Sequence, residues 1–506
     1  MCQKTLHIPK FIYIIRMKEI VPKGDKNMDI MDFAAKGIHA LTKNYGKKVC
    51  KSGPAPVIED VKPVEIKGNS FRAGFATDEI MPDLSDKNKI YWIAGHGSGH
   101  KMEGVLSPVY ISAMWLDCGN DEGILWLSAD IVGLTRIEVN KIRSMILESG
   151  EIKGCKGINF SCTHSHSGID TLGYWGKPNL VNIPSDGKDP AYMEMLMQKA
   201  VKVSVEAYKN RKAGKLYSGR IEIPGGLETG RGFLDKHEFL TRIRFAPEDG
   251  SNDIWLLNFG GHPNSLGGNN RMLSGEYPYY MREKITAENG AQVVFGIGAI
   301  GGMDVVNLDD EDRANCVKLQ GEMIAEKALE ISNDRELSPE IKFINQPFYI
   351  PVDNYVLTLL ALRHVMSFKA YPSEVSDIGI AMESEMTYMT IGDQKFVLLP
   401  GENFVSTVYG SYIPAEDSAS AKGGDFNPTP LAEIAGDSEI IAFGVTNDMA
   451  GYVVPPNDFV LHPTQPYLNT TSDRFDKRHY HETNAMGPNT QKAIADNFAK
   501  MVKNFG

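Results

Sequence analysis

Gly157-Ile-Asn-Phe-Ser-Cys-Thr-His164 is an apolar stretch that ends in polar residues, and it decides the fold class of this chain. The same pattern, an apolar run followed by a short polar or glycine-rich cluster, returns at residues 123–130, 254–262, 292–296, 395–402 and 440–447. Continuous apolar runs of this length are typical of strands that are buried on both faces of a sheet. The chain is therefore predicted to contain sheets that are covered on both sides.

Helical patterns lie between these runs, at residues 136–149, 191–208, 314–331 and 489–503. A further helix is predicted at residues 28–45, where apolar residues recur at helical spacing and Gly46 is a plausible stop. Strands that alternate with helices indicate an α/β fold, with mixed β-sheets flanked by helices. We expect residues 1–65 to form a helical appendage and linker, and residues 66–506 to form the main domain, with a surface excursion at 415–436.

The composition is that of a globular protein with a large core, since 42% of the 506 residues are hydrophobic. The formal net charge is −11, and no basic face of the kind that binds nucleic acid or anionic membranes is visible. We expect a small-molecule substrate and no nucleic-acid partner, and a homo-oligomer is left open. The six cysteines form no C-x-x-C pair, which favours reduced thiols.

The N-terminal run Phe11-Ile-Tyr-Ile-Ile15 is short, and Met17 could be the natural start. A secretory signal needs roughly 7–15 apolar residues, and a membrane span needs about 20. We therefore expect no membrane span and a cytoplasmic location.

Two histidines stand together in Thr163-His-Ser-His-Ser-Gly168. If the strand continues to His164, alternation places His164 and His166 on one face, where they would form half of a metal site. Imidazole nitrogens suit zinc. The alternative interpretation is a polar loop that contains two hydrogen-bonded histidines.

Three other residues follow apolar runs and could bind the same metal: His262, Glu402 and Tyr452. Each has an ordinary alternative, namely a solvated loop histidine, a helix-capping carboxylate and a buried aromatic ring. Asp130, at the end of another run, could orient a histidine or cap the following segment.

Taken in chain order, these segments resemble the neutral ceramidases, zinc amidases that cleave N-acyl sphingosine. The family segment T-H-T-H-S-G-P-G-G corresponds to residues 163–170, and N-A-D corresponds to Ser128-Ala-Asp130. The H-P-x-S, P-G-E and N-x-Y-x-x-Y segments correspond to residues 262–265, 400–402 and 447–452, and R-Y-E-A-x-S-x-x-G-P-H corresponds to 479–489. The resemblance extends from about Gly68 to the C-terminus.

The resemblance implies that His164, His262, Glu402 and Tyr452 bind one zinc ion, and that His166 lines the pocket. Arg231 corresponds to an arginine that contacts the substrate in the family. The expected reaction is attack of a zinc-activated water on an amide carbonyl, with the oxyanion stabilised by the metal and by Tyr452.

The chain departs from the family where a serine is expected beside the zinc-bound water. The family segment G-D-V-S-P-N is replaced by Gly301-Gly-Met-Asp-Val-Val-Asn307, so Asp304 is the nearest polar residue. His166 or Asp304 could accept the proton of the water. We also expect no C-terminal immunoglobulin-like domain.

These departures favour a substrate other than classical ceramide. One alternative is a cytoplasmic hydrolase of small polar esters, lactones or sugar-derived amides. Another is a non-catalytic protein with a structural zinc, closed by four protein ligands.

Overall fold

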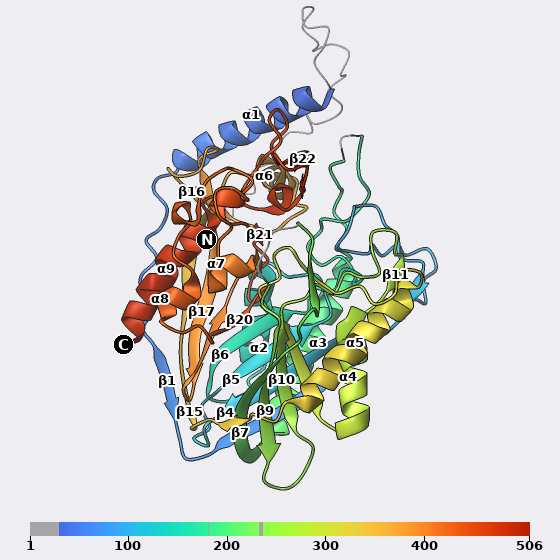
Figure 1. The fold of residues 1–506 in the computed structure, drawn as a ribbon, viewed down its shortest axis with the longest axis vertical. Coiled ribbons are helices and arrows are strands. Elements are labelled where there is room, and N and C mark those ends of the chain that lie inside the picture. Colours follow the sequence, from blue (N-terminus) through green and yellow to red (C-terminus); the bar gives the residue numbers. More distant parts are fainter. Residues whose placement is uncertain (1–29, 181, 232–235) are drawn as a thin grey trace, which may run out of the picture.

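The computed structural model describes residues 30–180, 182–231 and 236–506, and the described part is built around two large β-sheets (Figure 1). The N-terminal apolar run 11–15, Met17 and Cys2 lie outside the described residues. The nine-stranded sheet has the order β12-β10-β9-β7-β2-β4-β5-β6, and β14 also pairs with β7. Its strands are β2 (Phe71–Glu79), β4 (Tyr110–Asp117), β5 (Gly123–Ala129), β6 (Cys155–Cys162), β7 (Lys212–Glu222), β9 (Phe239–Pro247), β10 (Ile254–Phe259), β12 (Gln292–Ile297) and β14 (Arg335–Glu336).

The six-stranded sheet has the order β1-β15-β17-β18-β20, and β16 also pairs with β17. Its strands are β1 (Val64–Lys67), β15 (Glu340–Val352), β16 (Ala370–Pro372), β17 (Ile380–Ile391), β18 (Gln394–Leu398) and β20 (Ile441–Phe443). Both sheets are mixed, because β5–β6, β10–β12 and β18–β20 are parallel whereas most other pairs are antiparallel. Each of the six predicted apolar runs contains one of these strands.

Four short two-stranded pairs and several helices complete the described chain. The pairs are β3 (Gly104–Val105) with β11 (Met272–Leu273), β8 (Leu227–Thr229) with β13 (Met303–Val305), β19 (Glu402–Asn403) with β21 (Tyr452–Val453), and β22 (Thr471–Ser472) with β23 (Arg478–His479). The helices are α1 (Ile30–Cys50), α2 (Arg136–Glu148), α3 (Pro190–Lys209), α4 (Glu276–Asn289), α5 (Arg313–Glu330), α6 (Tyr355–Leu362), α7 (Val405–Tyr409), α8 (Leu431–Ala435) and α9 (Thr490–Phe505), with 3₁₀ turns η1 (Gly424–Phe426), η2 (Pro456–Asp458) and η3 (His481–Asn484).

Three apolar clusters show that the layers are stacked as helices, sheet, sheet, helices. Trp126 of the larger sheet packs edge-on against Phe443 of the smaller sheet, in a cluster that fills the space between the two sheets. A second cluster joins the outer face of the larger sheet to α2, α3, α4 and α5, and a third joins the smaller sheet to α6, α8 and α9. The predicted α/β class with sheets flanked by helices is therefore confirmed.

The predicted end of the first helix at Gly46 is wrong, because α1 continues through Gly46 to Cys50. Gly46 is required by packing rather than by a helix end: a Cβ there would come within 1.7 Å of the Ile378 carbonyl oxygen. Ala35 of this helix packs with Tyr355 of α6, and α1 lies across the end of the smaller sheet in Figure 1. The boundary at residue 65 stays a prediction, since β1 already begins at Val64.

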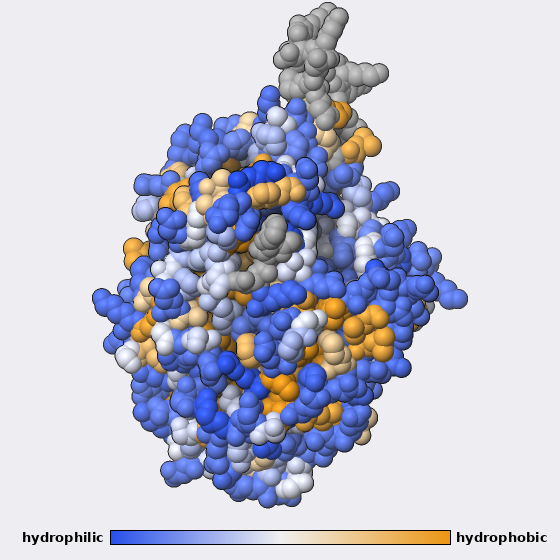
Figure 2. Space-filling view, viewed as in Figure 1, coloured by the Kyte–Doolittle hydropathy of each residue, from blue (hydrophilic) through white to orange (hydrophobic). Residues whose placement is uncertain are grey.

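No helix in the described ranges combines the length and the apolar character needed to cross a bilayer. Hydrophilic residues dominate the face shown in Figure 2, where apolar residues form separate patches. The five cysteines in the described part, Cys50, Cys118, Cys155, Cys162 and Cys316, are all free of disulfides, as predicted.

The two sheets are joined where the predicted polar clusters begin. Ser161 at the end of β6 bridges to Thr446, which follows β20, and Gly301 bridges to Phe404. The segments that follow β6, β10, β18 and β20 are thereby brought to one place. The carboxyl ends of strands are a usual location of ligand sites in α/β folds.

Candidate metal centre

Three buried histidines meet at this junction. One nitrogen atom each of His164, His166 and His262 lies within 4.8 Å of the others. The ring centroid of His164 is 4.8 Å from that of His166 and 5.1 Å from that of His262. The first two histidines follow β6 and the third follows β10, so both segments come from the larger sheet.

Backbone carbonyl groups fix the tautomers of two of these rings. His164 Nδ1 lies 2.6 Å from the Val132 oxygen, and His262 Nδ1 lies 2.9 Å from the Met303 oxygen. A carbonyl oxygen only accepts hydrogen bonds, so each Nδ1 carries a proton and donates it. In the neutral form of each ring the lone pair is therefore on Nε2, the atom that points into the cluster.

The Glu402 carboxylate adds a fourth donor, from the smaller sheet. Its Oε2 lies 2.9 Å from His262 Nε2 and 3.3 Å from His164 Nε2. Burial would raise the pKa of Glu402, but the charges and hydrogen bonds of the two histidines outweigh burial and hold it well below the usual value. Glu402 is therefore an anion in a site that is almost closed to solvent.

These donors fit a metal ion. Nε2 lone pairs and a carboxylate oxygen face one another at hydrogen-bond distance, and such a group of acceptors is stable only around a proton or a cation. His262 illustrates the need for positive charge: burial would lower its pKa, but Glu402 outweighs burial and raises it. Two or three imidazoles with one carboxylate are a usual zinc donor set.

His166 contributes a donor nitrogen of its own. The spacing of the two histidines predicted this donor, whereas the ligand set implied by the family resemblance did not include it. Its Nε2 lies 3.1 Å from His164 Nε2. Burial, followed by the charge of His164, lowers the pKa of His166 well below its usual value, so the ring is neutral. A neutral imidazole is the form that binds metals.

The two histidines after β6 do not meet for the reason expected from the sequence. β6 ends at Cys162, and His164 has the left-handed backbone angle φ = 63°. The turn, not strand alternation, brings the two rings together. Gly95 packs against this turn so closely that a Cβ would lie 2.4 Å from the His166 ring, which leaves room only for glycine.

Tyr452 is placed beside Glu402 by the short parallel pair β19–β21, in which these two residues are direct partners. Its ring centroid lies 6.4 Å from that of His262. Burial, together with the charge of Glu402, raises the pKa of Tyr452 well above its usual value, so the hydroxyl group keeps its proton. Tyr452 can therefore act as a hydrogen-bond donor at the edge of the cluster.

Asp304 lies next to the cluster, because its backbone forms an isolated β-bridge with that of His262. Its Oδ1 accepts a hydrogen bond of 2.7 Å from Asn264 Nδ2, and the side chain is half-buried. Asn264 lines the cavity described below. The carboxylate is thus connected to the cavity through an amide, and its role in proton transfer stays a prediction.

Arg231 lies behind the site rather than in the cavity lining. Its guanidinium pairs with Asp458 at 3.1 Å and with Glu482 at 2.5 Å, and it approaches His481 Nδ1 at 3.3 Å. The His481 ring is 4.6 Å from the Tyr452 ring, edge to face. Arg231 therefore reaches the cluster through His481, and the expected contact with substrate stays a prediction.

Asp130 does not orient a histidine. It accepts hydrogen bonds from the backbone N–H of Tyr110, at 2.9 Å, and from the guanidinium of Arg282. Backbone carbonyls take the orienting role instead.

His96 is a residue that the sequence reasoning missed: its ring lies 5.0 Å from that of His166, and its buried Nε2 has no partner among the described residues.

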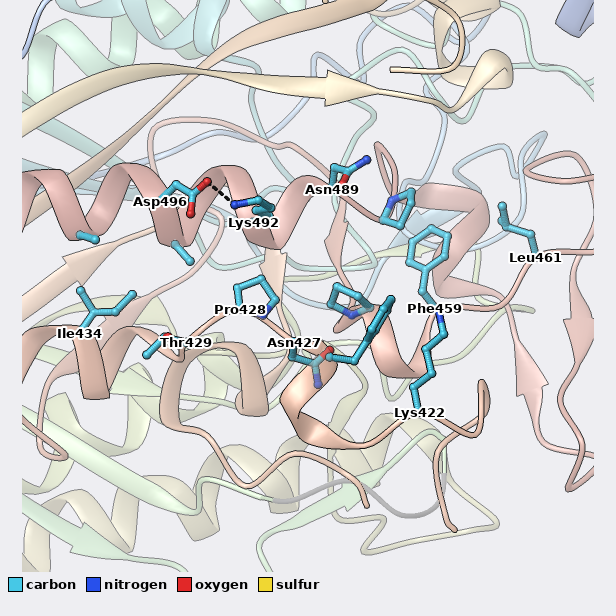
Figure 3. Close-up of a pocket in the computed structure, with 15 residues that line it drawn as sticks. Lys422, Asn427, Pro428, Thr429, Ile434, Phe459, Leu461, Asn489, Lys492 and Asp496 are labelled. Atoms are coloured by element: carbon cyan, nitrogen blue, oxygen red, sulfur yellow. Dashed lines mark hydrogen bonds and ion pairs between the residues drawn. The ribbon is translucent and has the colours of Figure 1, made fainter. Parts of the chain in front are cut away.

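A cavity of about 770 Å³ opens onto the cluster, and its lining includes His96, His164, His166, Glu402 and Tyr452. A second groove, of about 880 Å³, lies between α9 and the loop around η1, and its described lining contains no histidine (Figure 3). Lys492 in that groove is paired with Asp496 at 2.7 Å. Of these two hollows, only the first therefore combines metal donors with room for a substrate.

Glu276 supports the histidine turn from the first turn of α4 and yields a pH-dependent prediction. Ser167 Oγ donates a 2.5 Å hydrogen bond to its Oε1. Complete burial raises the pKa of Glu276 to about 7, although Ser167 opposes the shift. Because the folded state binds the Glu276 proton more tightly than the unfolded state does, protonation of Glu276 stabilises the fold. This stabilisation is fully present below the pKa of the glutamate in the unfolded chain, and it is lost as the pH rises towards 7.

We expect Glu276→Gln to remove this part of the pH dependence, because an amide does not ionise. Between pH 5 and 8 the free energy of unfolding of the wild type should fall relative to that of the variant, by up to about 3 kcal/mol. Urea titrations at several pH values, with metal held constant, measure the difference. Glu283→Gln, at an exposed position of α4, is the control, and parallel curves for Glu276→Gln and wild type would contradict the prediction.

The two packed sheets with flanking helices form a fold of the neutral ceramidase type. One similar solved structure is the neutral ceramidase from Pseudomonas aeruginosa, with a TM-score of 0.63 and 14% sequence identity over 86% of this chain and 74% of the ceramidase chain. A second is a ceramidase complexed with C2, with a TM-score of 0.62, 14% identity, and coverage of 86% and 75%. No family model matches the sequence, and no curated protein does.

Proposed function

We propose that this protein is a zinc-dependent hydrolase that cleaves an amide bond. The observation that carries the proposal is the convergence of His164, His166, His262 and Glu402 on one point beside a cavity. The ceramidase-like fold supports the amide, because the neighbouring structures are ceramidases. A bound zinc would supply Lewis-acid chemistry and lower the pKa of water to about 7.

The protein residues have separate tasks in this proposal. His164, His262 and Glu402 hold the metal, and backbone carbonyls fix the Nδ1 protons of the two histidines. Tyr452, whose hydroxyl group keeps its proton, donates a hydrogen bond to the carbonyl oxygen of the substrate as negative charge develops there. His166 or Asp304 accepts a proton from the attacking water and returns it to the leaving amine.

Two alternatives use the same residues differently. A hydrolase of small polar esters or lactones would need the same metal and the same oxyanion donor. Only a comparison of the substrates that are hydrolysed distinguishes it from an amidase. A structural zinc would be closed by four protein ligands, with His166 or Tyr452 as the fourth. The cavity, whose lining includes the proposed ligands His164 and Glu402, supports the catalytic function.

A substrate panel distinguishes these functions. The purified zinc-loaded protein is incubated with matched amides, esters and lactones, and the products are identified by mass spectrometry. Hydrolysis of amides that disappears in His164→Ala supports the proposal. If no member is hydrolysed and the metal does not exchange with a chelator, the zinc is structural. Cell fractionation tests the expected cytoplasmic location.

We predict little or no hydrolysis of long-chain ceramide. The serine of the ceramidase family is replaced at the segment that contains Asp304, and the cavity contains an unpaired charge, described below, that ceramide could not neutralise. Detergent-dispersed ceramide is compared with short-chain amides at equal concentration. Efficient ceramide turnover that His164→Ala abolishes would show that these departures do not exclude the lipid.

A further inference from the structure

Arg478 is the only lysine or arginine among the described residues that line the cavity of the metal centre. The other ionised residue there is Glu402, which already lies 2.9 Å from His262 Nε2 and 3.3 Å from His164 Nε2. The Arg478 side chain is exposed, and no described carboxylate pairs with it. A guanidinium without a partner at the border of a binding cavity is available to an anionic ligand.

The hairpin β22–β23 fixes the direction in which Arg478 points. Successive side chains of a strand point to opposite faces. His479 is buried, with Nδ1 at 2.7 Å from Glu482 Oε1 and Nε2 at 3.4 Å from Asp473 Oδ2. Arg478 and Tyr480, on either side of His479, both line the cavity.

The hairpin is held firmly, which limits the freedom of the arginine. The Asp473 carboxylate accepts hydrogen bonds from the backbone N–H groups of Phe475, at 2.8 Å, and Lys477, at 2.9 Å. Glu482, which holds His479, is itself paired with Arg231. The buried ion cluster behind the site therefore supports the position of Arg478.

A row of side chains leads from the metal donors to this arginine. The ring centroid of Tyr452 lies 6.4 Å from that of His262 and 6.2 Å from that of Tyr480, and Arg478, two residues before Tyr480, also lines the cavity. Exposure increases along the row, from buried Tyr452 through half-buried Tyr480 to exposed Arg478. The reacting bond would thus lie deep in the cavity, with the arginine at its outer border.

The cavity also has an apolar side next to the metal donors. Leu172 and Trp175 pack with Val132, whose carbonyl oxygen holds His164, and with Met449. All four residues line the cavity. A ligand that fits both features has an apolar part, a bond to be cleaved, and a negative charge.

We propose that the substrate is an amide that carries a carboxylate, of the N-acyl amino acid class, and that Arg478 selects it by pairing with that carboxylate. This inference rests on the proposed amidase function. One guanidinium balances one negative charge, which favours a carboxylate over a phosphate dianion. The acyl group lies against the apolar side, and the amino acid part extends towards the hairpin.

The experiment measures kcat and KM for N-hexanoyl derivatives of glycine, β-alanine and 4-aminobutyrate, which vary the distance between amide and carboxylate. Each is paired with its carboxamide, which has the same shape without the charge. We expect the best acid to exceed its carboxamide in kcat/KM by about 10-fold to 100-fold, mainly through KM. Arg478→Gln should remove this preference, Arg478→Lys should keep part of it, and the carboxamides should be unaffected.

Lys477→Gln is the matched control, because it removes an exposed charge of the same sign from the neighbouring position, outside the cavity lining. Equal kcat/KM values for acids and carboxamides in the wild type would overturn the inference while leaving the amidase function intact. A preference for N-hexanoyl phosphoethanolamine over every carboxylate would overturn it in favour of a phosphate. If no amide is hydrolysed, the proposed function fails. Calorimetry then still decides whether the arginine selects a carboxylate, because it compares the binding of the acids to the zinc-loaded wild type and to zinc-loaded Arg478→Gln.

Discussion

Alanine at His164, His262 or Glu402 is expected to remove most of the zinc from a protein that otherwise carries about one ion per chain. Each change deletes one donor atom from a buried group in which Glu402 Oε2 lies 2.9 Å from His262 Nε2 and 3.3 Å from His164 Nε2. Loss of a residue that only orients a ligand already costs about 10-fold to 100-fold in metal affinity, so loss of a ligand should cost at least that much. The rate of hydrolysis should fall in parallel with the zinc content.

Elemental analysis of the purified proteins measures this effect, and circular dichroism shows whether each variant folds. Glu402→Gln keeps the size of the side chain and removes the charge, so it separates metal binding from packing. His39→Ala, at a half-buried position of α1 outside the histidine cluster, is the control and should keep its zinc. A wild-type protein without transition metal, which also fails to bind added zinc, would contradict the central proposal.

Asp304→Asn is expected to reduce kcat by about 10²-fold to 10⁴-fold, the usual contribution of a general base. Asparagine keeps the shape and can still contact Asn264, but it cannot accept a proton from water. The zinc content should stay near that of the wild type, because Asp304 belongs to a strand that bridges to His262 and is not among the converging donors. Steady-state kinetics combined with elemental analysis measures both quantities.

The kcat and the zinc content of the Asp304→Asn variant together decide the role of Asp304. Normal kcat with normal zinc would remove it from the mechanism and leave His166 as the proton acceptor. Loss of zinc would place it among the metal ligands. Asp425→Asn, at an exposed position near η1, is the control for a change of charge alone.

The sequence could predict the fold class because that information is local. Each apolar run contains a strand, and the polar residue that follows it lies at the end of that strand, whatever the partner strand is. The runs that end near His164, His262 and Glu402 were therefore enough to predict an α/β fold with polar side chains at strand ends. Their convergence at one place was inferred from a resemblance, since no local pattern contains it.

Among the elements that the sequence patterns did not predict, β15 and α4 violate local rules for reasons that lie elsewhere in the fold. β15 contains Pro347 and Pro351, which argue against a strand. β1 pairs only with the first residues of β15, up to Phe343, so the prolines face an edge without a hydrogen-bonded neighbour. Helix α4 begins with Glu-Tyr-Pro, and proline in the first turn is compatible with a helix because the first N–H groups have no partner there.

The amino-acid sequence alone was sufficient for the α/β class, with mixed sheets, flanking helices and polar residues that end the strands, because periodicity and turn chemistry act between near neighbours. The tertiary structure decided which of these residues meet. His166 joins the donors through a left-handed turn at His164, Arg231 lies in a buried ion cluster, and Arg478 reaches the cavity through a braced hairpin. These relations depend on where segments far apart in the sequence come to lie, which is set by how the two sheets pack.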